Sequence, residues 1–306
     1  MRKKENKAYS TLTQNFDLLI DEPLKKYTSI KVGGPADLLA LPKNKQELKG
    51  LFKKASDLHI PITLFGGGTN LLVTDNGIRG LVVITKQLKS KISIIKTKSD
   101  KKELFTAAGE RLSKVCQIAI NHSLSGLEFA AGIPGTIGGS IMMNAGTKSG
   151  NMSDIVQSIE VLDPKTLTFK TIDKKDLDFS YRSLNLTDII VAATLTLNKK
   201  PLEKIEDAFK LNLSKKNATQ PVSFASAGCF FKNPALGKSA GELIEKSGLK
   251  GTRVNDAMVS EKHANFIVNN SNATCEDILL LKQHIQKTVL KKYQINLQTE
   301  VRVEGE

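Results

Sequence analysis

The 306-residue sequence contains no tryptophan, three cysteines, four histidines and only 5% aromatic residues. The three cysteines, Cys116, Cys229 and Cys275, are too few for a disulfide framework, and neither they nor the histidines have the spacing of metal ligands. No stretch approaches the roughly 18–20 consecutive apolar residues of a membrane span, and no apolar segment follows the basic first residues, as a secretory signal requires. We therefore predict a cytoplasmic protein in a reducing compartment, with no metal and no membrane partner.

Charge and composition narrow the class of protein. Charged residues make up 25% and hydrophobic residues 40% of the chain, which argues against disorder, and the length suffices for two domains or three small ones. Lysine and arginine number 45 against 31 aspartates and glutamates, and a net charge of +14 would attract anionic ligands, but the lysines are scattered in a way that favours an ordinary solvated surface. A nucleic-acid surface would interleave basic residues with aromatic ones, which are scarce here, so no nucleic-acid partner is predicted. A basic, non-catalytic polyanion-binding protein stays as an alternative that rests on the net charge alone.

Two segments are instead rich in glycine: residues 65–73 (FGGGTNLLV) and 131–140 (AGIPGTIGGS). Glycine lets the backbone adopt positive φ and approach a ligand closely, and successive N–H groups then form a concave nest that suits a pyrophosphate. The first segment is not a Rossmann fingerprint, because Leu71 stands where its third glycine would be. Two such loops predict a site for a large dinucleotide; the alternative is that both are merely tight turns.

The spacing of apolar residues predicts an α+β protein. We expect helices at 45–58, 112–120, 201–216, 239–247 and from 274 onward, and strands at 62–65, 81–84, 92–95, 104–107, 155–162, 168–172, 189–197, 257–260, 266–268 and 297–303. Cys116 shares a helix face with Leu112 and Val115 and is predicted to be a core residue. A proline-containing break at 220–223 marks a candidate domain boundary.

Three short segments carry polar residues that a solvated surface explains poorly: 179–183 (FSYRS), 226–234 (SAGCFFKNP) and 298–302 (QTEVR). Each could deliver one functional side chain. Considered one at a time, these residues have ordinary structural interpretations. Arg182 would be a salt-bridge partner, Cys229 a small core residue beside two phenylalanines, and Glu300 a solvated strand residue.

Taken together with the glycine loops, and in this order, these segments closely resemble the UDP-N-acetylenolpyruvoylglucosamine reductase (MurB) family of bacterial cell-wall enzymes. The resemblance covers almost the whole chain, and its motifs lie at 28–37 (TSIKVGGPAD), 66–73, 124–135 (LSGLEFAAGIPG), 144–146 (NAG), 181–182 (YR), 228–234 and 300–302. The chain between Arg182 and the strand at Ile189 is short, as in the form of the family that lacks an extra tyrosine-bearing loop.

The resemblance implies a two-subdomain FAD-binding fold of the PCMH/vanillyl-alcohol-oxidase type, followed by a C-terminal α+β substrate-binding domain. The expected boundaries are 1–85 and 86–218 for the two flavin subdomains, with the final strand 297–306 returning to the second, and 219–296 for the substrate domain. FAD would be bound non-covalently and reduced by NADPH. The reduced flavin would then convert UDP-N-acetylglucosamine enolpyruvate into UDP-N-acetylmuramate, a peptidoglycan precursor, without an obligate protein partner. The alternative within enzymes is another FAD-dependent oxidoreductase on the same fold, reduced by its own substrate.

The resemblance also assigns residues. Arg182, Cys229 and Glu300 would be catalytic, with Cys229 in the proton-donor position that the commonest family pattern fills with serine. A thiol, with a pKa of about 8.5, is a far stronger acid than an alcohol and can serve there. Tyr181 and Asn233 would bind substrate, although Asn233 can also be a turn residue before proline. Lys215 and Lys216 could contact the UDP phosphates or be ordinary surface lysines. The expected cofactor contacts are Gly66, Gly67, Gly68, Thr69, Asn70, Ile133, Pro134, Gly135, Gly138, Gly139, Asn144 and Gly146.

Overall fold

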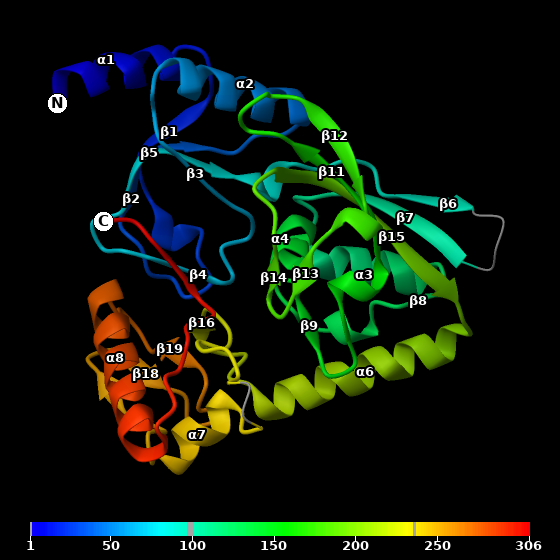
Figure 1. Ribbon diagram of the computed structural model, residues 1–306, viewed down its shortest axis with the longest axis vertical. Helices are drawn as coiled ribbons and strands as arrows, with labels where there is room; N and C mark the ends of the chain where they lie inside the picture. The colour runs from blue at the N-terminus through cyan, green and yellow to red at the C-terminus, as the bar shows by residue number, and fades with distance from the viewer. Residues whose placement is uncertain (1, 97–100, 235–236) are drawn as a thin grey trace. The chain divides into compact units, whose positions relative to one another are not determined.

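The computed structural model of the chain describes residues 2–96, 101–234 and 237–306 (Figure 1). The chain divides into two compact units, each assembled from segments that lie far apart in the sequence. Unit 1 comprises Met1–Leu18, Leu39–Gly67 and Val83–Lys216, and unit 2 comprises Leu19–Leu38, Gly68–Val82 and Asn217–Glu306. Of the helices in the described part of the chain, none has the length and apolar character that crossing a bilayer requires.

The helices match the apolar periodicity of the sequence closely. Those predicted at 45–58, 112–120, 201–216, 239–247 and from 274 are confirmed as α2, α3, α6, α7 and α8, whereas α1, α4 and α5 were not expected. The bounds are α1 (Arg2–Thr13), α2 (Lys45–Asp57), α3 (Leu112–Asn121), α4 (Ile137–Met142), α5 (Met152–Ile155), α6 (Leu202–Thr219), α7 (Ala240–Lys246) and α8 (Cys275–Tyr293).

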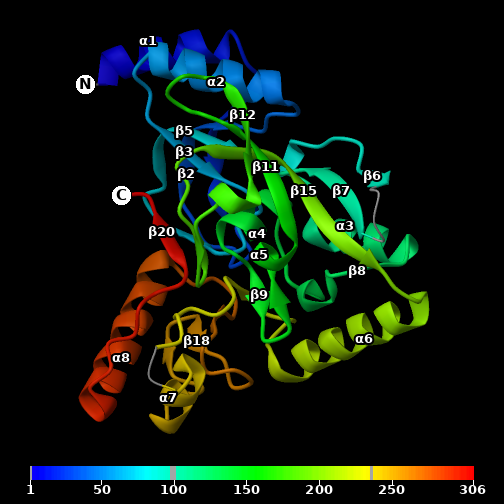
Figure 2. The same ribbon diagram turned by 45° about the vertical axis from the view of Figure 1, so that its right-hand side comes forward.

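A six-stranded antiparallel sheet dominates unit 1, and Figure 2 shows its strands β11, β15 and β7 side by side. Its order is β12-β11-β15-β7-β6, with β8 paired to the far end of β15. These strands are β6 (Ser93–Lys96), β7 (Lys101–Ala107), β8 (Leu124–Ser125), β11 (Val156–Leu162), β12 (Phe169–Asp173) and β15 (Ile189–Lys199). Residues Val191–Ala193 of β15 are all buried, so both faces of this central strand are covered.

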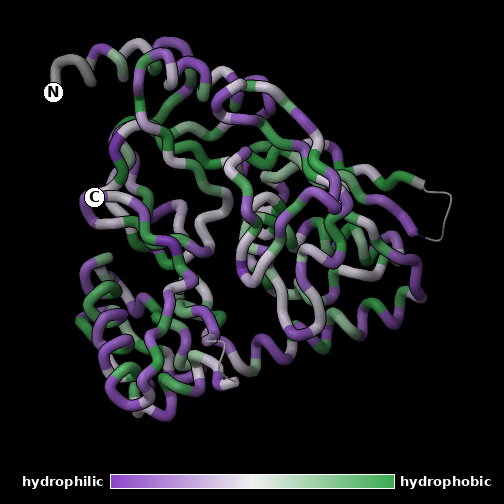
Figure 3. Tube along the Cα trace, in the orientation of Figure 1, coloured by the Kyte–Doolittle hydropathy of each residue, from purple (hydrophilic) through white to green (hydrophobic). Residues whose placement is uncertain are grey.

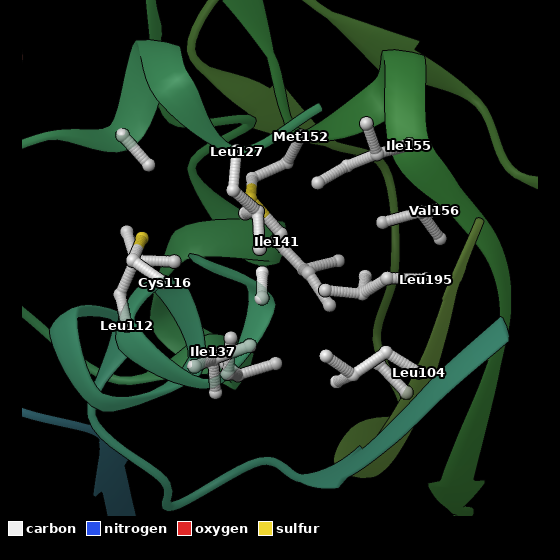
Figure 4. Packing of buried hydrophobic residues seen from close by; sticks show 14 of the residues in the cluster. Leu104, Leu112, Cys116, Leu127, Ile137, Ile141, Met152, Ile155, Val156 and Leu195 are labelled. Atoms are coloured by element: carbon white, nitrogen blue, oxygen red, sulfur yellow. The ribbon is translucent and has the colours of Figure 1, made fainter. Parts of the chain in front are cut away.

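The core of unit 1 forms where α3 and α4 pack on this sheet. Figure 4 shows Leu112 and Cys116 of α3 and Ile137 of α4 in one cluster with Leu104 of β7 and Leu195 of β15. Burying one such aliphatic side chain contributes roughly 1.5–3 kcal/mol. Cys116 is confirmed as a core residue, and burial raises the pKa of its thiol to about 12.

Two further sheets and several short pairs complete the fold. One sheet has the order β1-β2-β5-β3, and α2 leads into β3, whose end opens onto the first glycine loop. Its strands are β1 (Leu18–Pro23), β2 (Pro35–Ala40), β5 (Ile78–Ile84) and β3 (Ile62–Phe65). The short pairs are β9 (Gly146–Thr147) with β10 (Gly150–Asn151), β13 (Phe179–Ser180) with β14 (Ser183–Leu184), and β20 (Arg302–Glu304) with β4 (Leu71–Val73).

Unit 2 contains the antiparallel sheet β16-β19-β18-β17 together with α7 and α8. The strands are β16 (Ala225–Ser226), β19 (Ile267–Asn269), β18 (Ala257–Val259) and β17 (Arg253–Val254). Helix α8 begins at the expected capping box, where the Thr274 side chain accepts from the Asp277 N–H and the Asp277 carboxylate accepts from the Thr274 N–H. Figure 3 shows hydrophilic and hydrophobic residues alternating along α8. Its apolar stripe is buried: Ile278, Leu281, Ile285 and Val289.

The continuous strand predicted at 297–303 is wrong. Only Arg302–Glu304 is a strand, β20, and it pairs in parallel with β4. Before it, the backbone bonds to a different segment: Thr299 forms an isolated bridge with Phe231, and the Glu300 N–H donates to the Phe230 carbonyl at 2.9 Å. The alternation of residue types reflects the burial of Leu297 and Val301 in the core of unit 2 rather than one uninterrupted strand.

Candidate active site

Gly66 and Gly67 of the first glycine loop lie against the second glycine loop within unit 1. A Cβ added to Gly66 would stand 2.5 Å from Thr136 Oγ1, and one added to Gly67 would stand 3.2 Å from Gly135 Cα. Side chains larger than hydrogen therefore do not fit at Gly66 and Gly67 without displacing the second loop. The start of the first glycine segment and the second glycine segment therefore have closely spaced backbones.

The second loop ends in the short helix α4, and its two adjacent glycines have different surroundings. Gly138 donates its N–H to the Ala108 carbonyl at 2.9 Å, and a Cβ there would come within 2.9 Å of Ala108 Cβ. A Cβ on Gly139 would meet Thr136 Oγ1 at 3.4 Å, an ordinary van der Waals distance, and Gly139 is not among the residues with positive φ. Packing against Ala108 thus explains why residue 138 is glycine. No contact within the protein requires glycine at 139, so a ligand close to the backbone is one explanation for glycine there.

Helix α6 holds the start of the second loop. The Asn212 side-chain N–H donates to the Glu128 carbonyl at 2.8 Å, and the Lys216 ammonium donates to the Gly132 carbonyl. Gly132 has φ +72°, and a Cβ there would lie 3.0 Å from Leu213 Cδ1. Lys216 therefore secures the glycine loop; its expected contact with UDP phosphates, like that of Lys215, stays a prediction.

Asn144 fixes the hairpin that carries Arg182. Its side-chain carbonyl accepts from the Ser153 N–H at 3.0 Å, and its side-chain N–H donates to the Ser180 carbonyl at 3.0 Å. Ser180 pairs with Ser183 across β13 and β14, so Tyr181 and Arg182 form the two-residue turn between the strands. Asn144 was predicted as a cofactor contact, and that contact stays a prediction. The structure gives its side chain the additional role of holding this turn.

The turn places Tyr181 and Arg182 in a defined conformation. Arg182 has φ +58°, the left-handed region that hairpin turns use, and its guanidinium carbon lies 5.3 Å from the centre of the Tyr181 ring. Such a distance is typical of a cation–π contact. Tyr181 is 53% exposed, and its contact with substrate stays a prediction.

Cys229 lies in unit 2, half-buried beside the small cluster of Met258, Phe266 and Val268. The two residues that follow it, Phe230 and Phe231, are each 1% exposed, and their rings meet edge to face at a centroid distance of 5.4 Å. Cys229 therefore packs against a small apolar cluster, as the alternative interpretation expected, but it is only partly buried. Its role as proton donor stays a prediction.

The structure brings the segments of Cys229 and Glu300 together within unit 2. The Phe230 carbonyl accepts from the Glu300 N–H at 2.9 Å, and the Lys232 N–H donates to the Gln298 carbonyl at 2.8 Å. Asn70 reaches the same place, because its side-chain N–H donates to the Glu300 carbonyl at 3.1 Å. The end of the first glycine loop is therefore bonded directly to the backbone of Glu300. Arg182 belongs to the other compact unit.

Asn265 is the residue that sequence reasoning missed. It is 3% exposed, its side-chain carbonyl accepts from the Phe231 N–H at 2.9 Å, and its side-chain N–H donates to the Phe231 carbonyl at 2.8 Å. Its backbone carbonyl also accepts from the Phe230 N–H at 2.7 Å. The one signal in the sequence is a polar residue set between the apolar residues Ala264 and Phe266, where a buried strand was expected to begin.

Asn233 has a structural partner of its own. Its side-chain carbonyl accepts from the Ala240 N–H at 3.0 Å, at the first residue of α7, while the residue itself stays exposed. This hydrogen bond gives it the local role that the turn interpretation expected, and its contact with substrate stays a prediction.

A cavity of about 430 Å³ lies elsewhere in unit 1. Its lining includes Lys101, Lys174 and Lys200 and the buried residues Ser125 and Phe129, but none of the predicted cofactor, substrate or catalytic residues. Within residues 2–96, 101–234 and 237–306, no group of three or more histidine, cysteine, aspartate or glutamate residues could hold a metal ion.

Known proteins resemble the chain along most of its length. A family model described as the C-terminal domain of UDP-N-acetylenolpyruvoylglucosamine reductase matches residues 220–304, and one described as an FAD binding domain matches residues 36–171. UDP-N-acetylenolpyruvoylglucosamine reductase from Caldanaerobacter subterraneus subsp. tengcongensis is 40% identical over 292 residues, covering 94% of each chain. The protein of that name from Levilactobacillus brevis is 42% identical over 292 residues, covering 94% of this chain and 93% of its own. The crystal structure of UDP-N-acetylenolpyruvylglucosamine reductase (MurB) from Thermus caldophilus matches with a TM-score of 0.78 at 35% identity, covering 94% of this chain and 97% of its own.

Proposed function

The chain belongs to the UDP-N-acetylenolpyruvoylglucosamine reductase family, and from this premise we propose which of its residues carry each part of the reaction. It combines an FAD-binding fold with the family's C-terminal α+β domain. It is an NADPH-dependent oxidoreductase that converts UDP-N-acetylglucosamine enolpyruvate into UDP-N-acetylmuramate in peptidoglycan precursor biosynthesis. When bound, FAD would supply the redox chemistry, carrying a hydride from NADPH to the methylene carbon of the enolpyruvyl group.

The pyrophosphate of FAD is assigned to the paired glycine loops. Gly66 and Gly67 present backbone without side chains toward the second loop, and the room for a Cβ at Gly139 fits a ligand that approaches the backbone there. Neither loop contains cysteine or histidine, so the cofactor is held without a covalent bond through them. The assignment of the remaining predicted cofactor residues, and of the domain boundaries 1–85, 86–218 and 219–296, rests on the resemblance.

The different surroundings of Gly138 and Gly139 make this assignment testable. We expect Gly139→Ala to keep or slightly raise the stability of the apoprotein, because alanine favours a helix over glycine by about 1 kcal/mol. Its affinity for FAD should fall by about tenfold or more, because a methyl group would stand where the cofactor approaches, and overpacking costs about 1–3 kcal/mol. The measurements are the melting temperature without FAD and the dissociation constant of FAD by fluorescence quenching.

Gly138→Ala is the matched control. Its Cβ would meet Ala108 inside the protein, so the apoprotein itself should lose stability. If Gly139→Ala binds FAD as tightly as the native protein does, the pyrophosphate does not approach the backbone at Gly139.

Arg182 and Glu300 are assigned to the charge that develops on the substrate. When hydride reaches the methylene carbon, electron density shifts toward the neighbouring carbon and its carboxylate. The guanidinium of Arg182 is permanently positive and can donate two parallel hydrogen bonds to a carboxylate, so it stabilises this charge. The carboxyl of Glu300 contributes by a hydrogen bond, and its segment is held by Phe230 and Asn70.

Cys229 is assigned as the proton donor, and the observation that carries this assignment is the hydrogen bond between the Glu300 N–H and the Phe230 carbonyl. That bond brings the segment after the thiol next to the second catalytic residue. In the proton transfer, the S–H bond breaks and a C–H bond forms at the carbon beside the carboxylate. The thiolate then regains its proton from water, so one hydride from NADPH and one proton from solvent are added across the double bond.

Tyr181 and Asn233 are assigned to substrate binding, supported by their exposure. A cytoplasmic location is also proposed, where a reducing milieu keeps Cys116, Cys229 and Cys275 as the free thiols they are in the structure.

The test of this function is the visible absorption spectrum of the purified protein, recorded without oxygen. NADPH should bleach the flavin band, and UDP-N-acetylglucosamine enolpyruvate should then restore it. A flavin that NADPH does not reduce would indicate a different FAD-dependent oxidoreductase. A colourless protein that FAD cannot reconstitute would mean that the glycine loops are turns without a cofactor.

A further inference from the structure

Asn265 precedes strand β19 and forms three hydrogen bonds with the two residues that follow Cys229. Its side-chain amide uses both its carbonyl and its N–H on Phe231, and its backbone carbonyl accepts from the Phe230 N–H. A primary amide that accepts and donates to one residue in this way reproduces the hydrogen bonding of an adjacent β-strand. It fixes the orientation of the Phe231 peptide groups as well as their position.

The same short segment supports Glu300. The Phe230 carbonyl accepts from the Glu300 N–H, and the Lys232 N–H donates to the Gln298 carbonyl. These two hydrogen bonds pair the segment after Cys229 with the segment that contains Glu300. Phe230 therefore bonds to Asn265 through its N–H and to Glu300 through its carbonyl. Any rotation of this segment would move Cys229, which precedes it, relative to Glu300, which is bonded to it.

We propose that Asn265 is a positioning residue that sets the place of the Cys229 thiol relative to Glu300, although it touches no reacting atom. The inference rests on the proposed function, in which Cys229 supplies the proton. It concerns only the second half-reaction, because hydride transfer from NADPH to the flavin needs no proton from the thiol. A displacement of about 1 Å at a reacting group can cost about 100-fold in rate, so loss of the amide is expected to show in that step.

The chain offers a matched control in Asn269. This residue is 6% exposed, and its side-chain N–H donates to the Ile30 carbonyl at 3.1 Å. Its side-chain carbonyl accepts from the N–H groups of Ser271 and Ala273. Asn269 is thus as buried and as fully bonded to backbone as Asn265 is, but none of these bonds reaches the segment after Cys229. Replacing either asparagine by alanine removes comparable hydrogen bonds, so the two variants separate positioning from general stability.

The experiment follows both half-reactions of the FAD-loaded enzyme by anaerobic stopped-flow absorbance. Asn265→Ala should slow reoxidation by UDP-N-acetylglucosamine enolpyruvate by about 10- to 100-fold, whereas reduction by NADPH stays within about twofold of the native rate. Asn269→Ala should lower the melting temperature to a similar extent, but its two half-reaction rates should both stay within about twofold of native.

Asn265→Asp adds a readout that a purely structural role would not produce. Burial raises the pKa of the introduced carboxyl, which is therefore neutral at low pH and ionised above that pKa. The neutral carboxyl can accept from the Phe231 N–H and donate to the Phe231 carbonyl, as the native amide does, but the carboxylate has no proton to donate. Reoxidation by Asn265→Asp, divided by the native rate at each pH, should therefore recover as the pH falls. The ionisable residues around this segment, His263, Cys229, Lys232 and Glu300, are present in both proteins, so the ratio reports the introduced carboxyl together with its effect on their ionisation.

The outcomes distinguish a failure of the positioning role from a failure of the proposed function. Equal slowing of the two half-reactions in Asn265→Ala, or a rate ratio of Asn265→Asp that does not depend on pH, would overturn the positioning role. If Asn265→Ala does not fold, the pH profile of Asn265→Asp decides alone. Native reoxidation by Cys229→Ala, measured in the same series, would instead overturn the assignment of Cys229 as proton donor.

Discussion

Replacing Cys229 by alanine is expected to slow the substrate-driven reoxidation of the flavin by roughly 10²–10⁴-fold, the usual contribution of a positioned general acid. The reduction of FAD by NADPH should keep its native rate, because no proton from the thiol enters that step. Anaerobic stopped-flow absorbance at the flavin band measures each half-reaction separately. Because only the second half-reaction is slowed, a steady-state assay would show a lower kcat. NADPH would still reduce the bound FAD of this variant.

Cys229→Ser is the conservative counterpart. A hydroxyl occupies nearly the same place and can donate a proton, so this variant should retain substantial activity although an alcohol is a weaker acid than a thiol. Cys116→Ala serves as a second control, because that thiol is buried in the core of unit 1 and its loss should lower stability rather than either rate. Loss of both half-reactions to the same extent in Cys229→Ala would contradict the role as proton donor.

Arg182→Ala is expected to lower the rate of reoxidation by roughly 10²–10³-fold, the range found when one stabilising donor is removed from a developing negative charge. Arg182→Lys should recover only part of this loss. Lysine restores the positive charge but not the planar pair of donors that matches a carboxylate. Both rates and the dependence on substrate concentration are measured by the same stopped-flow method, with reduction by NADPH as the internal reference.

Arg253→Ala provides the control for loss of a positive charge, because Arg253 is exposed on β17 in unit 2. It should change neither half-reaction by more than about twofold. If Arg182→Ala raises KM without lowering the rate at saturating substrate, Arg182 binds the ground state and does not stabilise the developing charge.

The sequence predicts secondary structure well where one face of an element is buried. The apolar spacing of α2, α3 and α8 repeats with the period of a helix, and the structure buries those residues. Helix α1 was missed because most of its residues are polar and Leu12 alone cannot define a period. Helix α4 was missed because glycines at 138 and 139 lower helix propensity, and its capping by Thr136 depends on the conformation of the loop.

The sequence by itself determined the local chemistry of this protein: two glycine loops able to adopt close backbone conformations, the residue types at Arg182, Cys229 and Glu300, and the order of motifs that marks the family. These properties depend on residue identity and short spacing, which one chain displays directly. Only the tertiary structure decided which backbone groups each buried amide binds, because the partners lie far away in the chain. Asn265 bonds to Phe231 across 34 positions, and Asn70 to Glu300 across 230. A buried amide must satisfy its hydrogen bonds wherever folding brings donors and acceptors together, and no local pattern records where that is.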